Sequence, residues 1–272
     1  MDIFSLLLIK PLANGLVFFY KVLWGNMGLA IIAFSLFLRL ILSPLTKPYL
    51  ESMKKLKEVA PQLEKLKKKY KDDKVKLAQA QADFYKEKGV NPGAGCLPYI
   101  LQIIVLIAFF NVFMKVLSPN GDAILQFNQL LYEPLKFSTD SVLNTKFLYL
   151  DVTKPDVFNF PFIPFSIPGP VLIFTALVQF LSAKISSPYT KLEEKIANKT
   201  LEKTDDFQIA MQKSMIYTFP LFTLLIGMKF ASGLAIYWLV FSLTQVYQQV
   251  KNQGWGELTP YLEKINFHSK KL

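Results

Sequence analysis

The stretch LAIIAFSLFLRLILSPL, Leu29–Leu45, is apolar enough to lie in a lipid bilayer, yet it contains an arginine. Every other residue in it is uncharged, and Arg39 is the exception. A charged side chain at the centre of a transmembrane helix costs ~2.5–3.5 kcal/mol on insertion scales. The protein must offset that cost, and the way it does so points to its function.

The composition of the whole chain favours an integral membrane protein that is not an enzyme. It has 272 residues, of which 52% are hydrophobic, and a mean hydropathy of +0.30. The formal charge of +11 suits anionic lipids or RNA-rich partners such as ribosomes. A single cysteine, Cys96, and a single histidine, His268, offer neither a disulfide nor a metal-ligand cluster. Since catalytic and nucleotide-binding motifs are also absent from the sequence, we expect no catalytic residue, metal or cofactor.

Five stretches are long and apolar enough to cross a membrane. The expected fold is an all-α integral membrane protein with a five-helix transmembrane core, spanning at 27–46, 96–117, 165–185, 212–229 and 232–250. The prolines of FIPFSIPGP predict that the third helix starts near Pro170. The connecting segments are a helical hairpin at 47–95, a loop at 118–164, a loop at 186–211 and a tail at 251–272.

Lysine placement predicts the orientation. Of the 31 Lys and Arg residues, 23 lie in 47–95, 184–213 and 251–271, which we therefore place in the cytoplasm. The N-terminus and the loop 118–164 are then outside, and the C-terminus is inside. Residues 1–26 are interrupted by polar residues and by Pro11, which favours an amphipathic helix lying in the outer membrane interface. An additional membrane span is the alternative.

The predicted cytoplasmic hairpin has an apolar stripe that includes Leu56, Val59, Leu63 and Leu66. Lysines cover its other faces, and Lys71-Asp72-Asp73 makes the turn. One interpretation is a mobile platform that recruits a nascent chain or a ribosome. The other is a solvated antiparallel coiled coil that packs only on itself.

Three of the predicted spans carry one polar stripe each. Ser35 and Ser43 lie four residues before and after Arg39, on the same helix face. The stripe of the third span is Thr175, Gln179 and Ser182, and that of the fifth is Trp238, Ser242, Gln245 and Gln249. Polar residues in membrane spans face the bundle interior or a watery cavity. The three stripes therefore predict a hydrophilic groove, open to the cytoplasm and closed toward the outside, with Arg39 as its only charge. The alternative is that Arg39 extends toward headgroups or bonds backbone carbonyls.

Three longer motifs resemble a known family. They are GLAIIAFSLFLRLILSPLTKPYLESMKKLKEVAPQLEKLKKKYKDD, GVNPGAGCLPYILQIIVLIAFFNVF and MQKSMIYTFPLFTLLIGMKFASGLAIYWLVFSLTQVYQQ. In sequence and order they resemble the YidC/Oxa/Albino membrane protein insertases. The resemblance implies a bacterial cell membrane, five core spans around a groove open to cytoplasm and lipid, and a groove arginine at Arg39. It also implies that Gln179 and Trp238 line the groove and that an outer amphipathic helix precedes the first span.

The expected function is therefore an energy-independent insertase and chaperone for membrane proteins. Its expected partners are nascent membrane proteins with short or acidic translocated segments, anionic lipids, and, as candidates, the ribosome in transient contact and the Sec translocon. We expect it to function as a monomer. The alternatives are a small-solute or anion transporter with Arg39 as counter-ion, and a scaffold that only helps other membrane proteins to assemble.

Overall fold

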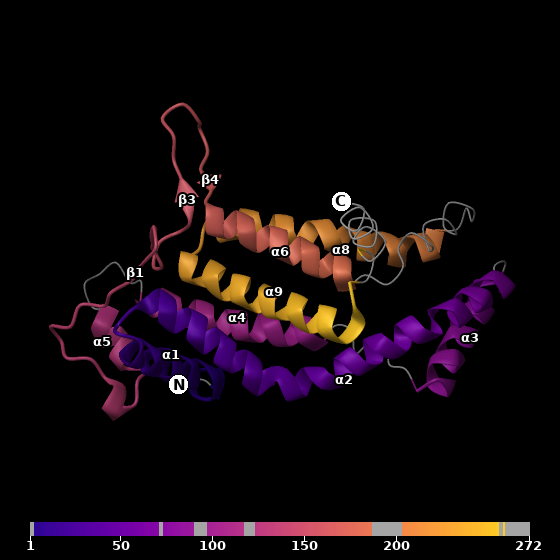
Figure 1. Ribbon diagram of the computed structural model, residues 1–272, viewed down its shortest axis with the longest axis horizontal. Helices are drawn as coiled ribbons and strands as arrows, with labels where there is room; N and C mark the ends of the chain where they lie inside the picture. Colours follow the sequence, from indigo (N-terminus) through magenta and orange to yellow (C-terminus); the bar gives the residue numbers. More distant parts are fainter. Residues whose placement is uncertain are drawn as a thin grey trace, which may run out of the picture. The chain divides into compact units, whose positions relative to one another are not determined.

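A computed structural model describes residues 3–70, 73–89, 97–116, 123–186, 203–255 and 258. The chain is mostly helical (Figure 1). It divides into two compact units. The first unit comprises Met1–Ile41, Leu101–Leu181 and Tyr217–Gln245. The second comprises Leu42–Ile100, Ser182–Ile216 and Val246–Leu272. Several helices begin in one unit and end in the other, so each unit contains segments that are far apart in the sequence.

The first unit starts with a helix that packs on the helix containing Arg39. A π-helical turn, η1 (Ser5–Ile9), continues into α1 (Lys10–Val22), and α2 (Met27–Lys69) follows after a short turn. A side chain at Gly15 would overlap the ring of Phe34, so the glycine permits close helix packing there. The ring of Phe19 lies 5.8 Å from that of Phe34, which adds an aromatic contact beside the glycine.

The other helices of the first unit join through aromatic side chains. Their full bounds are α4 (Leu97–Val116), α6 (Pro170–Ser186), α8 (Lys203–Gly227) and α9 (Ser232–Gln253). Phe109 of α4 lies 5.8 Å from Phe34 of α2 and stacks on Tyr237 of α9 at 4.6 Å. Phe180 of α6 lies 5.6 Å from Tyr217 of α8. α6 begins at Pro170, where the prolines of the sequence predict it.

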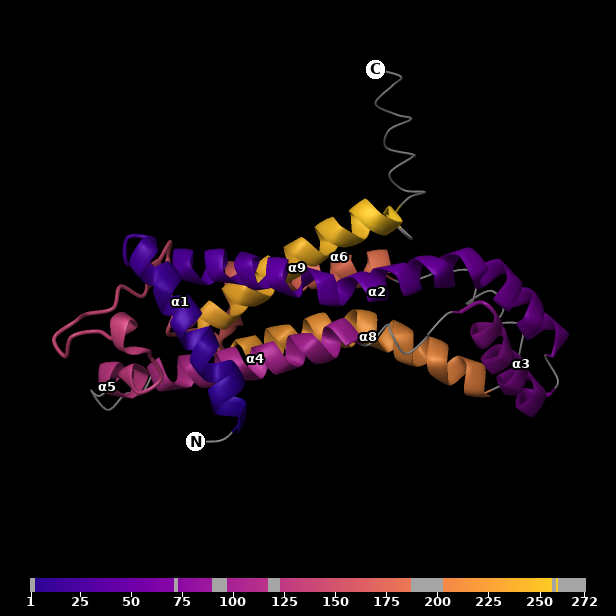
Figure 2. The ribbon, with the colours of Figure 1, turned by 90° about the horizontal axis from the view of Figure 1, so that it is seen from below.

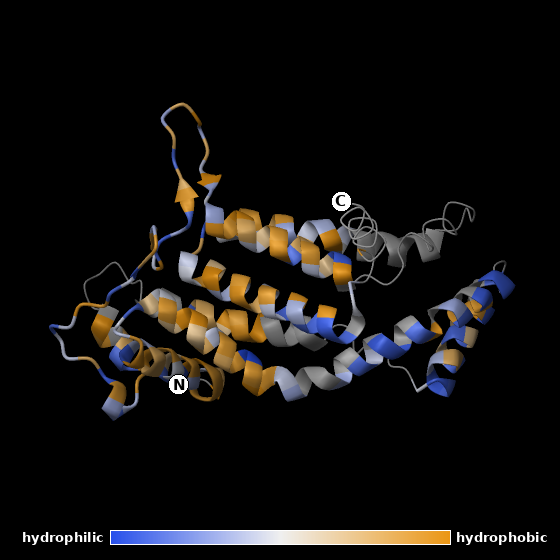
Figure 3. Ribbon diagram, in the orientation of Figure 1, coloured by the Kyte–Doolittle hydropathy of each residue, from blue (hydrophilic) through white to orange (hydrophobic). Residues whose placement is uncertain are grey.

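The outward faces of these helices are apolar and exposed (Figure 3). The exposed set includes Leu40 and Ile41 on α2, Ile103 and Ile107 on α4, Ile173, Phe174 and Leu177 on α6, and Leu221, Phe222 and Leu225 on α8. By length and composition, Ser5–Val22 and Met27–Pro44 could each cross a membrane, and three shorter apolar helical stretches lie within α4, α6 and α8. Apolar faces of this extent are the surface expected against lipid. The fold is thus that of an all-α membrane protein.

The described part of the segment between α4 and α6 holds two short helical elements and four short strands, and the strands were not predicted from the sequence. The elements are α5 (Ala123–Asn128), η3 (Glu133–Leu135), and the antiparallel pairs β1 (Lys146–Phe147) with β2 (Leu150–Asp151) and β3 (Val157–Phe158) with β4 (Ile167–Pro168). Lys146 pairs with Asp151, and Val157 pairs with Pro168. Each strand pair is only two residues long, too short for alternation to reveal it in the sequence.

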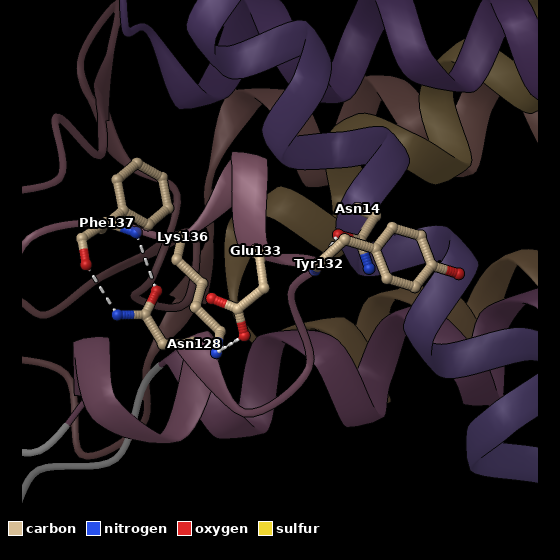
Figure 4. A network of polar contacts seen from close by, with 6 residues as sticks. All are labelled: Asn14, Asn128, Tyr132, Glu133, Lys136 and Phe137. Atoms are coloured by element: carbon tan, nitrogen blue, oxygen red, sulfur yellow. Dashed lines mark hydrogen bonds and ion pairs between the residues drawn. The ribbon is translucent and has the colours of Figure 1, made fainter.

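This connecting segment is bound to α1 by the buried side chain of Asn14 (Figure 4). Its Nδ2 donates to the carbonyls of Lys10 and Leu130 at 2.8 and 2.9 Å, and its Oδ1 accepts from the backbone N–H of Tyr132 at 2.7 Å. Asn128 exchanges two further hydrogen bonds with the backbone of Phe137. The polar atoms of both amide side chains are therefore used to hold the segment in place.

The same segment also forms hydrogen bonds with the N-terminal residues of three helices at one end of the first unit. The N–H of Met27 in α2 donates to the carbonyl of Asn144 at 3.1 Å. The N–H of Ser232 in α9 donates to the carbonyl of Lys154 at 2.7 Å. The N–H of Leu172 in α6 donates to Oδ2 of the buried Asp156 at 2.8 Å. α2, α6 and α9 therefore begin at a common end.

In the second unit, α2 continues without a break to Lys69, although Pro44, Pro48 and Pro61 lie inside it. The predicted span 27–46 and the predicted first arm of the hairpin thus belong to one helix. α3 (Lys74–Glu87) runs back beside the last turns of α2 in both views (Figures 1 and 2). Asp73 caps α3, because its carboxylate accepts from the N–H of Lys76 at 3.0 Å.

Some predictions concern residues outside the described ranges. They include Cys96 and the rest of 90–96, most of the predicted loop 186–211, and most of the predicted tail 251–272 with His268. The side chain of Leu56, in the predicted recruiting stripe, also lies outside the description.

Candidate functional site

Arg39 faces the interior of the first unit. Only 8% of its surface is exposed, whereas the next residue, Leu40, is 73% exposed and faces outward. The guanidinium is thus enclosed by protein instead of lying along the outer surface of α2. A buried charge is costly unless nearby groups stabilise it, so the contacts of Arg39 decide its role.

One such contact is the ring of Phe241 on α9. The guanidinium carbon Cζ lies 4.4 Å from the centroid of that ring, which is cation–π geometry. Sequence analysis missed Phe241 because it has no polar atom. Its position three residues after Trp238 was the available signal, since that spacing puts both residues on one face of α9.

The polar neighbours on α2 differ in their placement. Ser35 is buried, and its Oγ donates to the carbonyl of Ile31, one turn earlier, at 2.5 Å. Its hydroxyl oxygen can still accept a hydrogen bond. Ser43 is half-buried and belongs to the second unit.

On α6, the predicted stripe contains both a bonded and an unbonded polar side chain. The Oγ1 of Thr175 lies within hydrogen-bond distance of the carbonyls of Val171, at 2.7 Å, and Ala235, at 3.3 Å. Thr175 is fully buried and ties α6 to α9, so it is placed for helix packing. Gln179 is 93% buried, and its Oε1 has no hydrogen-bond partner among the described residues.

On α9, Trp238 and Ser242 are buried, and Gln245 is half-buried. The indole Nε1 of Trp238 finds no hydrogen-bond acceptor in the described part of the chain. Leaving a buried donor or acceptor unsatisfied costs about 1–3 kcal/mol, and native proteins usually satisfy such atoms with water or a ligand. Gln179 and Trp238 therefore mark an interior that can accept a water molecule or a ligand.

The C-terminal ends of the predicted polar stripes on α6 and α9 contact each other in the second unit. The Oγ of Ser182 donates to Oε1 of Gln249 at 3.1 Å, and both side chains are buried. Like Thr175, Ser182 therefore joins two helices. Of the groove residues predicted from the sequence, those buried in the first unit are Ser35, Arg39, Thr175, Gln179, Trp238 and Ser242.

The chemistry available to this set is non-covalent binding. Arg39 supplies a positive charge, Trp238 a donor, and Gln179 both donors and acceptors. Within the described ranges, no three His, Cys, Asp or Glu side chains gather as metal ligands. Each of these side chains can hold an anionic or hydrogen-bonding group by charge or by hydrogen bonds.

The predicted recruiting stripe lies on the part of α2 in the second unit. Val59, Leu63 and Leu66 are half-buried there, as expected for an apolar stripe on a helix with lysines on its other faces. Their role in recruitment remains a prediction.

Comparison with known proteins identifies the family. Residues 18–255 match the 60Kd inner membrane protein family. The chain is 30% identical over 225 residues to the membrane protein insertase YidC of Fusobacterium nucleatum, covering 83% of this chain and 85% of that protein. It is 33% identical over 227 residues to the YidC insertase of Prosthecochloris aestuarii, and 30% identical over 245 residues to that of Caulobacter vibrioides. These alignments cover 82% and 88% of this chain but only 32% and 35% of the two relatives.

The relatives are bacterial and are named for the insertion of membrane proteins, so the family is one of insertases and not of enzymes. The family match covers far more than half of the chain, and the relationship to the Fusobacterium protein extends over most of both proteins. The chain therefore belongs to the 60Kd inner membrane protein family, the family of the YidC membrane protein insertases.

Proposed function

We propose that this protein inserts membrane proteins into the bacterial cell membrane and assists their folding. The observation that carries the proposal is a buried arginine on a helix whose outer face is apolar. The unsatisfied buried polar atoms of Gln179 and Trp238 support it, because water or a polar client segment would satisfy them. A hydrated interior of this kind lowers the apolar barrier that a client's polar flank must cross.

Arg39 is the group that holds the flank in this mechanism. An acidic side chain of the client pairs with the guanidinium, which the ring of Phe241 covers on one face. Charge pairing in a low-dielectric interior is stronger than in water, so a brief contact is enough to draw the flank inward. The client's hydrophobic segment then leaves sideways into lipid, and burial of about 20 apolar residues there drives the step. No nucleotide is needed.

The proposed topology has five crossings, with the N-terminus outside and the C-terminus in the cytoplasm. The common end at which α2, α6 and α9 begin supports this arrangement, since these helices would all run from outside to inside. α8 ends at the same level, because a side chain at Gly227 would overlap Leu172 near the start of α6. The lysine-rich segments then lie on the opposite side, as the positive-inside rule requires.

In this topology α1 lies in the outer interface. Asn14, Tyr20 and Lys21 of α1 all bond to the segment 130–144, which would lie outside. A loop bound along about 10 Å of a helix fits a helix lying beneath it, whereas a spanning helix would meet the loop only near its end. The exposed apolar residues of η1 and α1, such as Leu7 and Phe18, would then face lipid.

We further propose that α3 and the distal part of α2 receive clients on the cytoplasmic side. Lysines on these helices attract anionic lipids and ribosomal RNA, and the stripe of Val59, Leu63 and Leu66 offers an apolar contact. The ribosome and the Sec translocon are the proposed transient partners, and a monomer contains the whole proposed site.

The test uses purified protein in vesicles and two versions of one client, with an acidic or an uncharged flank. Arg39→Ala should reduce insertion of the acidic version at least about tenfold, the effect of losing roughly 1.4 kcal/mol of binding, and should spare the uncharged one. Arg39→Lys, which keeps the charge, should retain most of the activity. Equal loss for both clients would instead assign Arg39 a structural role. Solute flux through the vesicles without any insertion would favour a transporter.

A further inference from the structure

The hairpin formed by β3 and β4 presents an unusual number of exposed aromatic side chains. Phe162 is 96% exposed and Phe165 is 68% exposed, and Phe158 and Phe160 are also exposed. The hairpin projects from the start of α6 (Figure 1). In water these rings would be left without an apolar environment, so a surface that covers them is to be expected.

The hairpin is fixed to α6 by the buried carboxylate of Asp156. The backbone of Asp156 accepts from the N–H of Gly169 at 2.8 Å, and its side chain accepts from the N–H of Leu172 and from the hydroxyl of Tyr149. A side chain at position 169 would overlap that carboxylate, so the glycine allows the close approach. The position of the hairpin therefore follows that of the first turn of α6.

The length of α6 indicates what the hairpin meets. Its 17 residues span about 26 Å, whereas the hydrocarbon core of a bilayer is about 30 Å thick. The uncharged part is shorter still, because Lys184 lies near the far end of the helix. On the near side, no charged residue occurs between Val157 and Pro170, so the uncharged surface continues from α6 into the hairpin.

We propose that the β3–β4 hairpin is a lipid anchor, with Phe160, Phe162 and Phe165 inserted at the boundary between the headgroups and the acyl chains. Aromatic side chains are enriched at that depth. Between the strands, the loop 159–166 leaves most of its backbone groups without the regular pairing of a strand or helix, so it must stay near water and cannot enter the hydrocarbon core. The aromatic tip therefore adds apolar contact next to a helix that is shorter than the hydrocarbon core.

Lipid is the occupant that the surroundings favour. The exposed face of α6, with Ile173, Phe174 and Leu177, continues the apolar surface of the hairpin, and it faces lipid if α6 crosses the membrane. The choice of lipid as the occupant therefore rests on the membrane crossing of α6 given under the proposed function. A protein partner would have no charged group to recognise between positions 157 and 170.

The experiment measures the depth of single spin labels on the full chain in vesicles of phosphatidylcholine and phosphatidylglycerol. In a Cys96→Ser background, Phe162→Cys tests the anchor, Leu177→Cys tests the span, and Val142→Cys is the control at a side chain that is 92% exposed. Phe160→Cys provides a second test position in the hairpin. Labels at the hairpin positions and at Leu177 should be relaxed by oxygen more than by a water-soluble nickel chelate, and the label at Val142 should show the reverse.

The outcomes separate the anchor from the span. Hairpin labels that behave like the Val142 label, with the Leu177 label still in lipid, would overturn the anchor and leave the span intact. Water access at Leu177 as well would contradict the proposed crossing itself. Hairpin labels shielded from both relaxing agents would show that protein, instead of lipid, covers the tip, and would also overturn the proposal.

Discussion

The guanidinium of Arg39 lies over the ring of Phe241, with Cζ 4.4 Å from the ring centroid. Phe241 also neighbours Tyr237, at 6.3 Å between centroids, and Tyr237 stacks on Phe109. The only arginine of the chain thus rests at the end of an aromatic series that joins α2, α4 and α9. In an enclosed site this contact offsets part of the cost of burying the charge.

We predict that Phe241→Leu destabilises the protein by about 0.5–2 kcal/mol, the range estimated for cation–π contacts. The substitution keeps an apolar side chain but removes the ring. In an Arg39→Ala background its effect should be smaller, because the charge that the ring stabilises is already absent. Thermal unfolding of the unmodified protein, the two single variants and the double variant measures the coupling, with Phe222→Leu on the exposed face of α8 as control. If the stability losses of Phe241→Leu and Arg39→Ala simply added in the double variant, the contact between the two side chains would not stabilise the protein.

The hydrogen bonds of Asn14 lead to a second prediction. Asn14→Asp preserves the shape of the side chain but turns a donor toward two carbonyls into an acceptor, and it buries a charge. We expect a loss of at least about 2 kcal/mol. Asn252→Asp, at an exposed amide near the end of α9, is the control and should change little. Limited proteolysis within 130–144 would report whether the segment has come loose from α1.

Gly169→Ala should destabilise the start of α6. The added methyl group overlaps the carboxylate of Asp156, and relief of that overlap by movement costs about 1–3 kcal/mol. Combining it with Asp156→Ala removes the clash, so the double variant should lose less stability than the sum of the two single variants. If the decrease in unfolding temperature of the double variant equalled the sum of the two single decreases, the carboxylate of Asp156 would not lie against position 169.

Alkaline pH should weaken the contact between Tyr149 and Asp156. Burial raises the pKa of Tyr149 from 10.0 to about 12. Because the pKa is higher in the folded state, the stabilising effect of the protonated hydroxyl is complete below pH 10 and is lost as the pH rises toward 12. Unfolding temperatures across this window should fall less steeply in Tyr149→Phe than in the unmodified protein.

Local signals in the sequence predicted the features that depend on neighbouring residues. Proline placed the start of α6, and four-residue spacing placed Ser35 and Arg39 on one inward face of α2. The contacts that were missed join distant residues. Asn14 and Leu130 are 116 positions apart, and Asp156 binds the N–H of Leu172 from outside the helix. No periodicity encodes such pairs, because each depends on how the helices pack.

The polar stripes indicate which faces of the helices point inward, and their role in a groove stays a prediction. Spacing identified Thr175 and Ser182 as groove residues, but their hydroxyls bond across to α9. A hydroxyl on an inward helix face serves either purpose, and only the position of its partner distinguishes packing from binding. The water-filled groove itself stays a prediction, since the structure places Arg39 in an enclosed setting.

The most direct measurement of the central claim is photocrosslinking from α6 to a stalled nascent client. A photoreactive residue at Gln179 probes the interior, and one at Leu177, two residues away on the exposed face, is the matched control. The account predicts that a client with an acidic flank crosslinks strongly from Gln179 and weakly from Leu177, and that Arg39→Ala reduces the Gln179 product. Equal crosslinking from both positions, or none from Gln179, would contradict it.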